Sequence, residues 1–254
     1  MLLAIDVGNT NITLAVFDGE RLRRKRRLET DPPRSAARYG REILRCVGEN
    51  ARIDAVVYGS VVPRLNRVIK ELSLRRFGRR AVAVTPHSPL GVRLRVDRPS
   101  EVGADRLLNS LAVYRMHGGP AIVLDFGTAA TFDCVSTKGD YLGGAILPGP
   151  ELSSRALALY TAKLPRVEMR RPRRVIGKNT VECIQAGLYH GYAGMISHVL
   201  DKSIKEMKVR GGRRVTVIAT GGLARVFLRE IPRIDRVEQD LTLHGLRLAY
   251  GIIC

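Results

Sequence analysis

The chain has 254 residues, of which 45% are hydrophobic and 26% are charged. A chain of this size and composition can bury more than half of its unfolded surface, which excludes intrinsic disorder as its main state. Its 43 Lys and Arg outnumber its 24 Asp and Glu, and the net charge of +19 meets the electrostatic condition for attracting polyanions without showing that it binds them. Because the sequence has neither a long apolar run nor a secretory signal, we expect a soluble cytoplasmic protein with no membrane partner.

The first part of the chain predicts alternating strands and helices. Residues 2–5 are an apolar run typical of a buried strand, and residues 11–17 are rich in β-formers. Asp18-Gly19 predicts a hairpin turn into the basic segment 21–27. The elements expected next are a helix around 43–47, a strand at 55–58, a helix after Pro63 and a strand at 81–84.

The second part repeats the opening. A helix from Glu101 to about Met116 ends before the breaker Gly118-Gly119-Pro120. The elements expected after the breaker are strands at 121–124 and 131–136, a third strand into 143–144, a long helix from 179 to about 207, a strand at 215–218 and a last helix from 241. The repeat predicts an α/β protein of two similar lobes, 1–117 and 118–254, that face each other across a cleft.

Three glycine-containing turns follow predicted buried strands. In Asp6-Val7-Gly8-Asn9-Thr10, the glycine lets backbone amides approach an anion and the carboxylate can hold a hydrated divalent cation. Alone, this pattern also builds plain turns. A second copy, Asp125-Phe126-Gly127-Thr128-Ala129, and a third turn, Thr220-Gly221-Gly222, favour a phosphate or nucleoside site.

Gly103-Ala104-Asp105-Arg106 opens the helix before the predicted boundary. Its carboxylate could accept a proton from a hydroxyl group while the arginine binds an anionic substrate. An aspartate that only complements the helix dipole, beside an exposed arginine, explains the spacing equally well. Neither a P-loop nor a dinucleotide-binding glycine motif is present.

The basic runs at 21–27, 75–80 and 170–174 lack interleaved aromatic residues. This favours a solvated surface over a platform for stacked bases, so we expect no nucleic-acid partner. The five histidines and four cysteines show no metal-ligand spacing, and neither a zinc site nor a disulfide framework is expected.

The ordered set of motifs resembles the type III pantothenate kinases along the whole chain. The set is DVGNT at 6–10, GSVVP at 59–63, EVGADR at 101–106, DFGTA at 125–129, GGAILPG at 143–149, TAKLP at 161–165, GKNT at 177–180 and TGG at 220–222. The resemblance implies two duplicated ribonuclease-H-like lobes of the acetate and sugar kinase, heat-shock chaperone and actin fold, with a nucleotide in the interlobe cleft. It implies phosphorylation of pantothenate by ATP to 4'-phosphopantothenate, the first step of coenzyme A biosynthesis.

The resemblance also implies roles for single residues. Asp105 is the general base, Asp6 holds Mg²⁺ directly or through water, and Asp125 holds a monovalent cation, K⁺ or NH₄⁺. Thr180 reaches pantothenate from a partner subunit, which implies a homodimer. The implied ATP and phosphate contacts are Asp6, Val7, Gly8, Asn9, Thr10, Asn11, Gly127, Thr128, Ala129, Gly221 and Gly222. The implied pantothenate contacts are Gly103, Ala104, Asp105, Arg106, Gly144 and Thr180.

Two other functions stay open at this point. A transcriptional accessory paralogue of the same fold would suit the basic surface, and a kinase for another small hydroxyl substrate would use the same turns. The presence of both Asp105 and Asp125 argues against the first, and the Gly-Ala-Asp-Arg context argues against the second. Residues 96–99 read Val-Asp-Arg-Pro where many relatives carry Tyr before Asn-Pro, so this part of the pantothenate pocket departs from the family pattern.

Overall fold

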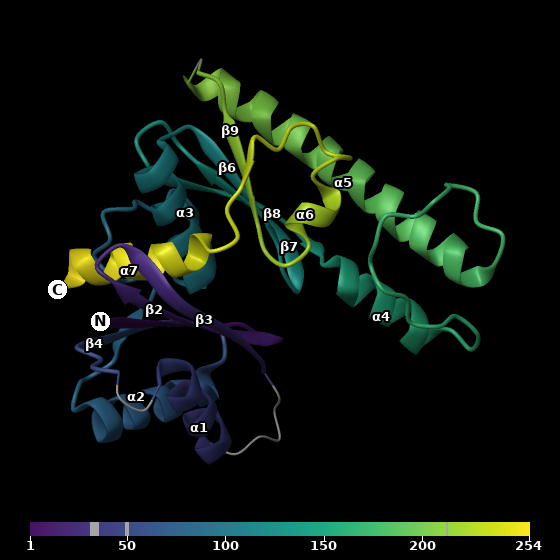
Figure 1. Ribbon diagram of the computed structural model, residues 1–254. Coiled ribbons are helices and arrows are strands. Elements are labelled where there is room, and N and C mark those ends of the chain that lie inside the picture. The colour runs from purple at the N-terminus through teal and green to yellow at the C-terminus, as the bar shows by residue number, and fades with distance from the viewer. Residues whose placement is uncertain (31–35, 49–50, 212) are drawn as a thin grey trace. The chain divides into compact units, whose positions relative to one another are not determined.

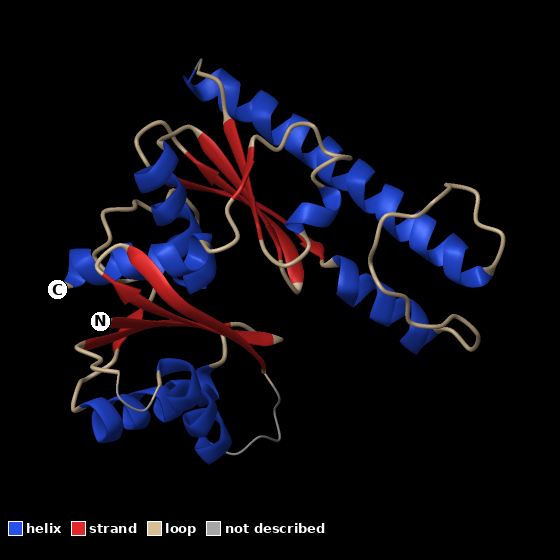
Figure 2. Ribbon diagram, viewed as in Figure 1, coloured by secondary structure: helices blue, strands red, loops and turns tan. Residues whose placement is uncertain are grey.

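The computed structural model of the chain describes residues 1–30, 36–48, 51–211 and 213–254. These residues form two compact units, each with one five-stranded sheet and helices packed against it (Figures 1 and 2). The first unit comprises Met1–Val92, Val96–Ala112 and Leu241–Cys254, and the second comprises Arg93–Arg95 and Val113–Asp240.

The sheet of the first unit has the strand order β3-β2-β1-β4-β5. Its strands are β1 (Leu2–Val7), β2 (Asn11–Asp18), β3 (Arg21–Glu29), β4 (Ala55–Ser60) and β5 (Val82–Val84). The central strand β1 pairs antiparallel with β2 and parallel with β4. The helices of this unit are α1 (Ala36–Val47), α2 (Pro63–Phe77), the first part of α3 (Ala104–His117) and α7 (Leu241–Ile253), and the short 3-10 helix η1 (Pro99–Glu101) precedes α3.

Alternation along β1 decides which helices cover which face of the first sheet. Leu3, Ile5 and Val7 join a buried cluster with side chains of α1 and α2, including Ile43 and Leu65. The intervening residues face the opposite side, because successive side chains of a strand point to opposite faces. That side is covered by α7, which contacts β1, β4 and β5 (Figure 1).

The sheet of the second unit has the order β10-β9-β6-β7-β8. Its strands are β6 (Ala121–Phe126), β7 (Ala129–Val135), β8 (Tyr141–Pro148), β9 (Thr216–Thr220) and β10 (Arg236–Val237). Like β1, the central strand β6 pairs antiparallel with the strand that follows it and parallel with a later strand. The same strand order and pairing in both sheets confirm the predicted duplication and the predicted α/β class.

The second unit also contains α4 (Pro150–Tyr160), α5 (Thr180–Gly211) and the short α6 (Ala224–Phe227). One face of its sheet packs against α5 and α6, where Phe126 stacks on Phe227 with ring centroids 5.3 Å apart. Although α5 has 32 residues, none of the described helices combines the length and apolar character needed to cross a membrane.

The two units differ from the predicted lobes, 1–117 and 118–254, in three segments, the first of which is Arg93–Arg95 in the second unit. Residues 113–117, the end of α3, group with the second unit, and α7 groups with the first. Gly245 of α7 lies so close to α3 that a Cβ there would come within 2.4 Å of the Leu108 carbonyl oxygen. The Thr242 hydroxyl also donates to Asn109 Oδ1 at 2.7 Å. Sequence order cannot reveal this return of the last helix to the first sheet.

Candidate active site

The turn between β1 and β2 holds the first predicted phosphate site. The Gly8 amide donates to the Asn11 carbonyl at 2.9 Å, which closes the turn. Thr30 braces it from the end of β3, since its hydroxyl donates to the Gly8 carbonyl at 2.8 Å and its amide donates to the Thr10 carbonyl at 2.8 Å. Asp6 is half-buried and Asn9 is exposed. The turn is therefore rigid, and its polar groups lie at the surface of the first unit.

The start of α3 lies at the same end of the first unit as Asp6. Asp6 pairs in register with Gly59 of β4. A Cβ on Gly59 would lie 3.6 Å from the Ala104 Cβ and 2.8 Å from Leu108 Cδ1, so α3 packs against the strand where the side chain is missing. The structure thus brings the Gly-Ala-Asp-Arg motif to the carboxyl end of the first sheet. Gly59 was not among the predicted site residues, although it opens the GSVVP motif.

Asp105 is half-buried in the first turn of α3. Its Oδ1 accepts a hydrogen bond from the Arg106 amide at 2.8 Å. The aspartate therefore complements the start of the helix, as one of the two sequence interpretations predicts. Its carboxylate also stays accessible enough to meet a substrate hydroxyl, so the two interpretations are compatible.

In the second unit, the turn after β6 and the turn after β9 meet. Asp125 and Thr220 are register partners at the carboxyl ends of these parallel strands. Gly221 has φ +88, and a Cβ there would lie 2.6 Å from both Asp125 Oδ1 and the Phe126 carbonyl oxygen. Only glycine allows this close approach without strain. The structure therefore joins two of the three predicted turns.

Gly149, which follows β8, packs closely against the turn after β6. Its amide donates to the Thr128 carbonyl at 2.9 Å, and a Cβ on it would come within 2.2 Å of that oxygen. Gly127 and Thr128 are exposed, and the Gly127 amide donates to the Ala129 carbonyl at 3.1 Å. Gly149 shapes the predicted phosphate turn but was missed as a site residue. The signals in the sequence are its place at the end of the GGAILPG motif and directly before Pro150, at the start of a helix.

Gly144 and Thr180 lie elsewhere in the second unit. Gly144 is exposed in the middle of β8, opposite Asp133. Thr180 is the exposed first residue of α5, and Figure 1 shows this end of α5 beside α4 and away from β6 and β9. The structure therefore does not bring Thr180 to the turns that hold Asp125 and Gly221.

The first turn of α5 is fixed by reciprocal hydrogen bonds. Asn179 Oδ1 accepts from the Glu182 amide at 2.9 Å, and Glu182 Oε2 accepts from the Lys178 amide at 2.9 Å. The Lys178 amide holds the pKa of Glu182 below its ordinary value, and the nearby positive charge of Arg174 adds to the effect. This arrangement resembles a capping box and presents Thr180 in a defined orientation.

The donor groups at both turns suit hard cations, which prefer oxygen ligands. Asp6 offers a carboxylate at the end of β1. At the second turn, Asp125 Oδ1 and the Phe126 carbonyl oxygen both border the space that a Cβ on Gly221 would fill. Asp125 Oδ1 and the Phe126 carbonyl oxygen thus form an oxygen cradle whose chemistry suits a monovalent cation, whereas Asp6 offers one carboxylate.

Comparison with protein families identifies one match along most of the chain. The model of the family described as type III pantothenate kinase matches residues 2–202. The chain is 47% identical to the type III pantothenate kinase of Moorella thermoacetica over 254 residues, which cover 98% of each protein. It is 46% identical to that of Geobacter sulfurreducens, again over 98% of each, and 46% identical to that of Myxococcus xanthus, over 99% of this chain and 98% of the relative.

Solved structures share the fold at low sequence identity. A conserved Baf family transcriptional activator from Campylobacter jejuni has a TM-score of 0.63 at 17% identity, covering 98% of each chain. A ROK hexokinase from Thermus thermophilus has a TM-score of 0.53 at 16% identity, covering 100% of this chain and 99% of the other. Such likeness shows the fold alone, and it confirms the predicted fold of actin-like sugar kinases and their relatives.

Proposed function

The chain belongs to the type III pantothenate kinase family, and on that premise we propose how its residues transfer the γ-phosphoryl group of ATP to pantothenate. The observation that carries the assignment is 47% identity to a type III pantothenate kinase over 98% of both chains. The protein is a phosphotransferase with ATP as co-substrate, and its reaction opens coenzyme A biosynthesis. We expect it to act in the cytoplasm.

The turn at 6–11 binds the phosphates of ATP. Its amides and the side chains of Asn9 and Thr10 contact phosphate oxygens, while Asp6 holds Mg²⁺ directly or through water. When bound, Mg²⁺ offsets the charge that develops on the phosphate oxygens. The bracing of this turn by Thr30 supports the assignment, because phosphoryl transfer depends mainly on rigid positioning of the phosphates.

Asp105 accepts the proton of the pantothenate hydroxyl and orients that hydroxyl toward the γ-phosphate. Its ordinary acidity suffices, because in a loose transition state the hydroxyl need not be deprotonated before attack. Arg106 binds the pantothenate carboxylate by charge, and Gly103, Ala104 and Gly144 line the same substrate. The packing of α3 on Gly59, next to Asp6, supports this assignment within the first unit.

In the second unit, residues 127–129 contact phosphate and Gly221-Gly222 flank the adenosine. Asp125 holds K⁺ or NH₄⁺, which supplies positive charge near the phosphates when bound. The oxygen cradle between Asp125 and Gly221 supports this role. We further propose that both lobes, 1–117 and 118–254, contribute to nucleotide binding.

A homodimer completes the pantothenate site in this proposal, with Thr180 supplied by the partner subunit. Large apolar side chains are exposed near Thr180, in α4 and in the loop before α5. They are Leu159, Tyr160, Val175 and Ile176, and the last is 76% exposed. Exposed apolar groups gathered in one region of a protein indicate an interaction site. A second copy of the chain would cover them.

Product analysis tests the proposal directly. The full-length protein is incubated with ATP and Mg²⁺ and, in separate reactions, with pantothenate, glucose or acetate, and phosphorylated products are identified by mass spectrometry. We expect phosphopantothenate alone. Phosphorylation of glucose or acetate without phosphopantothenate would overturn the assignment. The likeness to a transcriptional activator favours no second function, because at 17% identity it shows only a shared fold.

A further inference from the structure

We propose that Asp133 is a positioning residue which, through Thr131, fixes the carboxylate of Asp125 for nucleotide binding. This inference rests on the role proposed above for Asp125. Asp133 was not a predicted site residue, and in the sequence it is one polar residue within a strand. In the structure it is a carboxylate with 0% of its surface exposed.

Burial makes Asp133 unusual within its strand. Its neighbours Phe132 and Cys134 face the apolar cluster beneath α5, so Asp133 faces the opposite side of the sheet. A buried carboxylate is costly unless hydrogen bonds compensate for the lost water. Val135, on the same face as Asp133, shows that an apolar side chain can be accommodated there.

Two hydroxyl groups donate to Asp133. The Thr131 hydroxyl donates to Oδ2 at 3.3 Å, and the Tyr141 hydroxyl donates to Oδ1 at 3.4 Å. Tyr141 is itself 1% exposed. Each carboxylate oxygen therefore has a hydroxyl donor from a different direction, which fixes the plane of the carboxylate and, in return, the position of the Thr131 side chain.

Thr131 connects this pair to the site. It is the register partner of Asp125 across the antiparallel strands β6 and β7. Side chains of directly opposed residues lie on the same face, with Cβ atoms about 4.5 to 5.5 Å apart. Thr131 therefore restricts the space open to the Asp125 side chain on one side, while Gly221 borders its Oδ1 on the other.

Backbone hydrogen bonds with Arg93 and Arg95 hold Tyr141 in place. Its amide donates to the Arg93 carbonyl at 2.9 Å, and its carbonyl accepts from the Arg95 amide at 2.8 Å. The register of β7 and β8 shifts between Asp133 and Val135, where β8 carries an extra residue. Such bulges re-aim side chains, and this one presents Tyr141 to Asp133.

A purely structural role makes a different prediction from a positioning role. If Asp133 only fixes the register of β7 and β8, its loss lowers stability and leaves nucleotide affinity unchanged. If it positions Asp125, its loss weakens nucleotide binding even where the protein stays folded. Outer partners of cation ligands typically change affinity or activity by about 10-fold to 100-fold.

The experiment measures binding rather than turnover. Full-length protein is titrated calorimetrically with a non-hydrolysable ATP analogue and Mg²⁺, in potassium chloride and in tetramethylammonium chloride, and its Tm is recorded. The variants are Asp133→Asn and Thr131→Val. Thr131→Val removes one hydroxyl at nearly constant volume, so the test stays decisive even if Asp133→Asn does not fold. Thr131→Ser, in contrast to Thr131→Val, keeps the hydroxyl. Ser136→Ala is the matched control, because the Ser136 hydroxyl accepts from the amides of Lys138 and Asp140 in the turn of the same hairpin.

We expect Thr131→Val and Asp133→Asn to weaken binding in potassium chloride by about 10-fold and to reduce the difference between the two salts. Thr131→Ser should bind like the unchanged protein, and Ser136→Ala should lower the Tm without changing affinity. Unchanged affinity in Thr131→Val, with or without a lower Tm, would overturn the inference. Asp125→Asn separates the role of Asp133 from the role of Asp125. If Asp125→Asn leaves nucleotide affinity unchanged, the proposed role of Asp125 fails as well. If Asp125→Asn weakens nucleotide binding but the variants at Asp133 and Thr131 do not, only the role of Asp133 is overturned.

Discussion

Asp105 is the residue of the first unit that we propose as proton acceptor for the pantothenate hydroxyl. Replacement by Asn keeps the size of the side chain and an oxygen for the Arg106 amide, but removes the proton acceptor. We predict that Asp105→Asn lowers kcat by about 10²-fold to 10⁴-fold, the usual contribution of general acid-base catalysis. Steady-state kinetics and thermal unfolding check this. Asp18→Asn, at the exposed end of β2, serves as the control and should keep the full rate. An unchanged kcat in Asp105→Asn would contradict the role of base.

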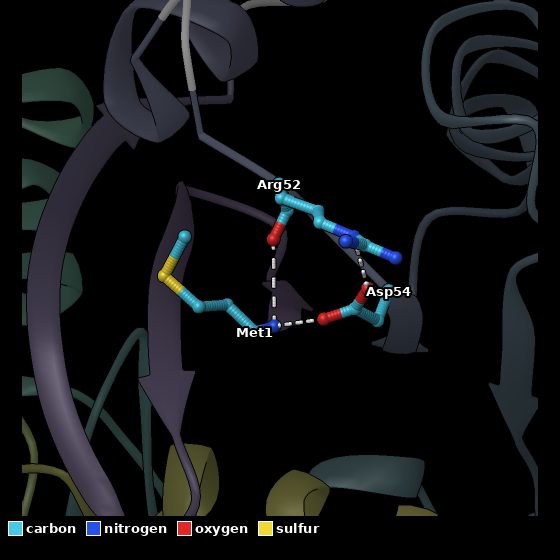
Figure 3. Close-up of polar contacts among 3 residues, drawn as sticks. All are labelled: Met1, Arg52 and Asp54. Carbon is cyan, nitrogen blue, oxygen red and sulfur yellow. Dashed lines mark hydrogen bonds and ion pairs between the residues drawn. The ribbon is translucent and has the colours of Figure 1, made fainter.

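Asp54 ties the start of the chain to β4. The Met1 ammonium group donates to its carboxylate and to the Arg52 carbonyl, and Arg52 Nε lies 3.3 Å from Asp54 Oδ1 (Figure 3). The hydrogen bond from the ammonium group holds the pKa of Asp54 below its ordinary value. Because the folded-state pKa is the lower one, the stabilisation is present above the unfolded pKa and is lost as pH falls through the folded pKa.

We therefore predict that Asp54→Asn flattens the decline of stability between about pH 5 and pH 3, where carboxylates titrate. Denaturant unfolding at a series of pH values measures this, with Asp97→Asn as the comparison. The effect should be small, since the group is exposed and screened by solvent. Parallel curves for Asp54→Asn and the unchanged protein would show that the contact does not contribute.

Among the elements, β3 combines an edge position with dense positive charge. It forms one edge of the first sheet, and its basic side chains from Arg21 to Arg27 are exposed. Two of them form ion pairs, Arg23 with Asp18 at 2.8 Å and Arg26 with Glu42 at 3.1 Å. Charged side chains on an edge strand oppose its pairing with the edge of another sheet. This gives the basic run at 21–27 a role in the fold of the first unit.

We predict that replacing Arg21 and Arg27 together by Thr increases aggregation at an unchanged Tm, because Thr favours strands and removes the repulsion. Light scattering during incubation measures the effect. Replacement of Arg75 and Arg76 by Thr removes the same charge from the last turn of α2 and is the control. Equal aggregation of the two double variants would assign the effect to net charge alone.

The sequence predicts the strands of both sheets except the two-residue β10, because apolar runs and turns are local signals. Residues 2–5, 55–58 and 121–124 all lie within strands of the structure. Packing between distant segments leaves no such local signal. The close packing of Gly245 against α3 and of Gly149 against Thr128 is visible only in the folded structure. The burial of Asp133 is likewise not predicted by the sequence, because a polar residue within a strand normally predicts an exposed position.

At the scale of the whole molecule, the exposed apolar side chains of α4 and the loop before α5 predict a dimer. Leu159 is 74% exposed and Tyr160 is 82% exposed. We predict that light scattering coupled to size-exclusion chromatography gives twice the mass of the chain, and that Ile176→Asp shifts the protein to the monomer. Activity should fall with dissociation, because Thr180 would no longer reach the partner's site.

Leu74→Asp supplies the control for this test. Leu74 is 56% exposed on α2, in the first unit, so its replacement adds the same charge outside the proposed interface. It should leave the mass and the activity unchanged. A monomeric unchanged protein with full activity would contradict the dimer and the role of Thr180 together.

The measurement that tests the central claim most directly is the rate of ADP formation from ATP and Mg²⁺, with and without pantothenate, in potassium and in sodium salts. The account predicts ADP formation that requires pantothenate and is much faster in potassium, because the ion proposed at Asp125 is K⁺ or NH₄⁺ rather than Na⁺. ADP formation at the same rate with and without pantothenate, or no turnover in either salt, would contradict it.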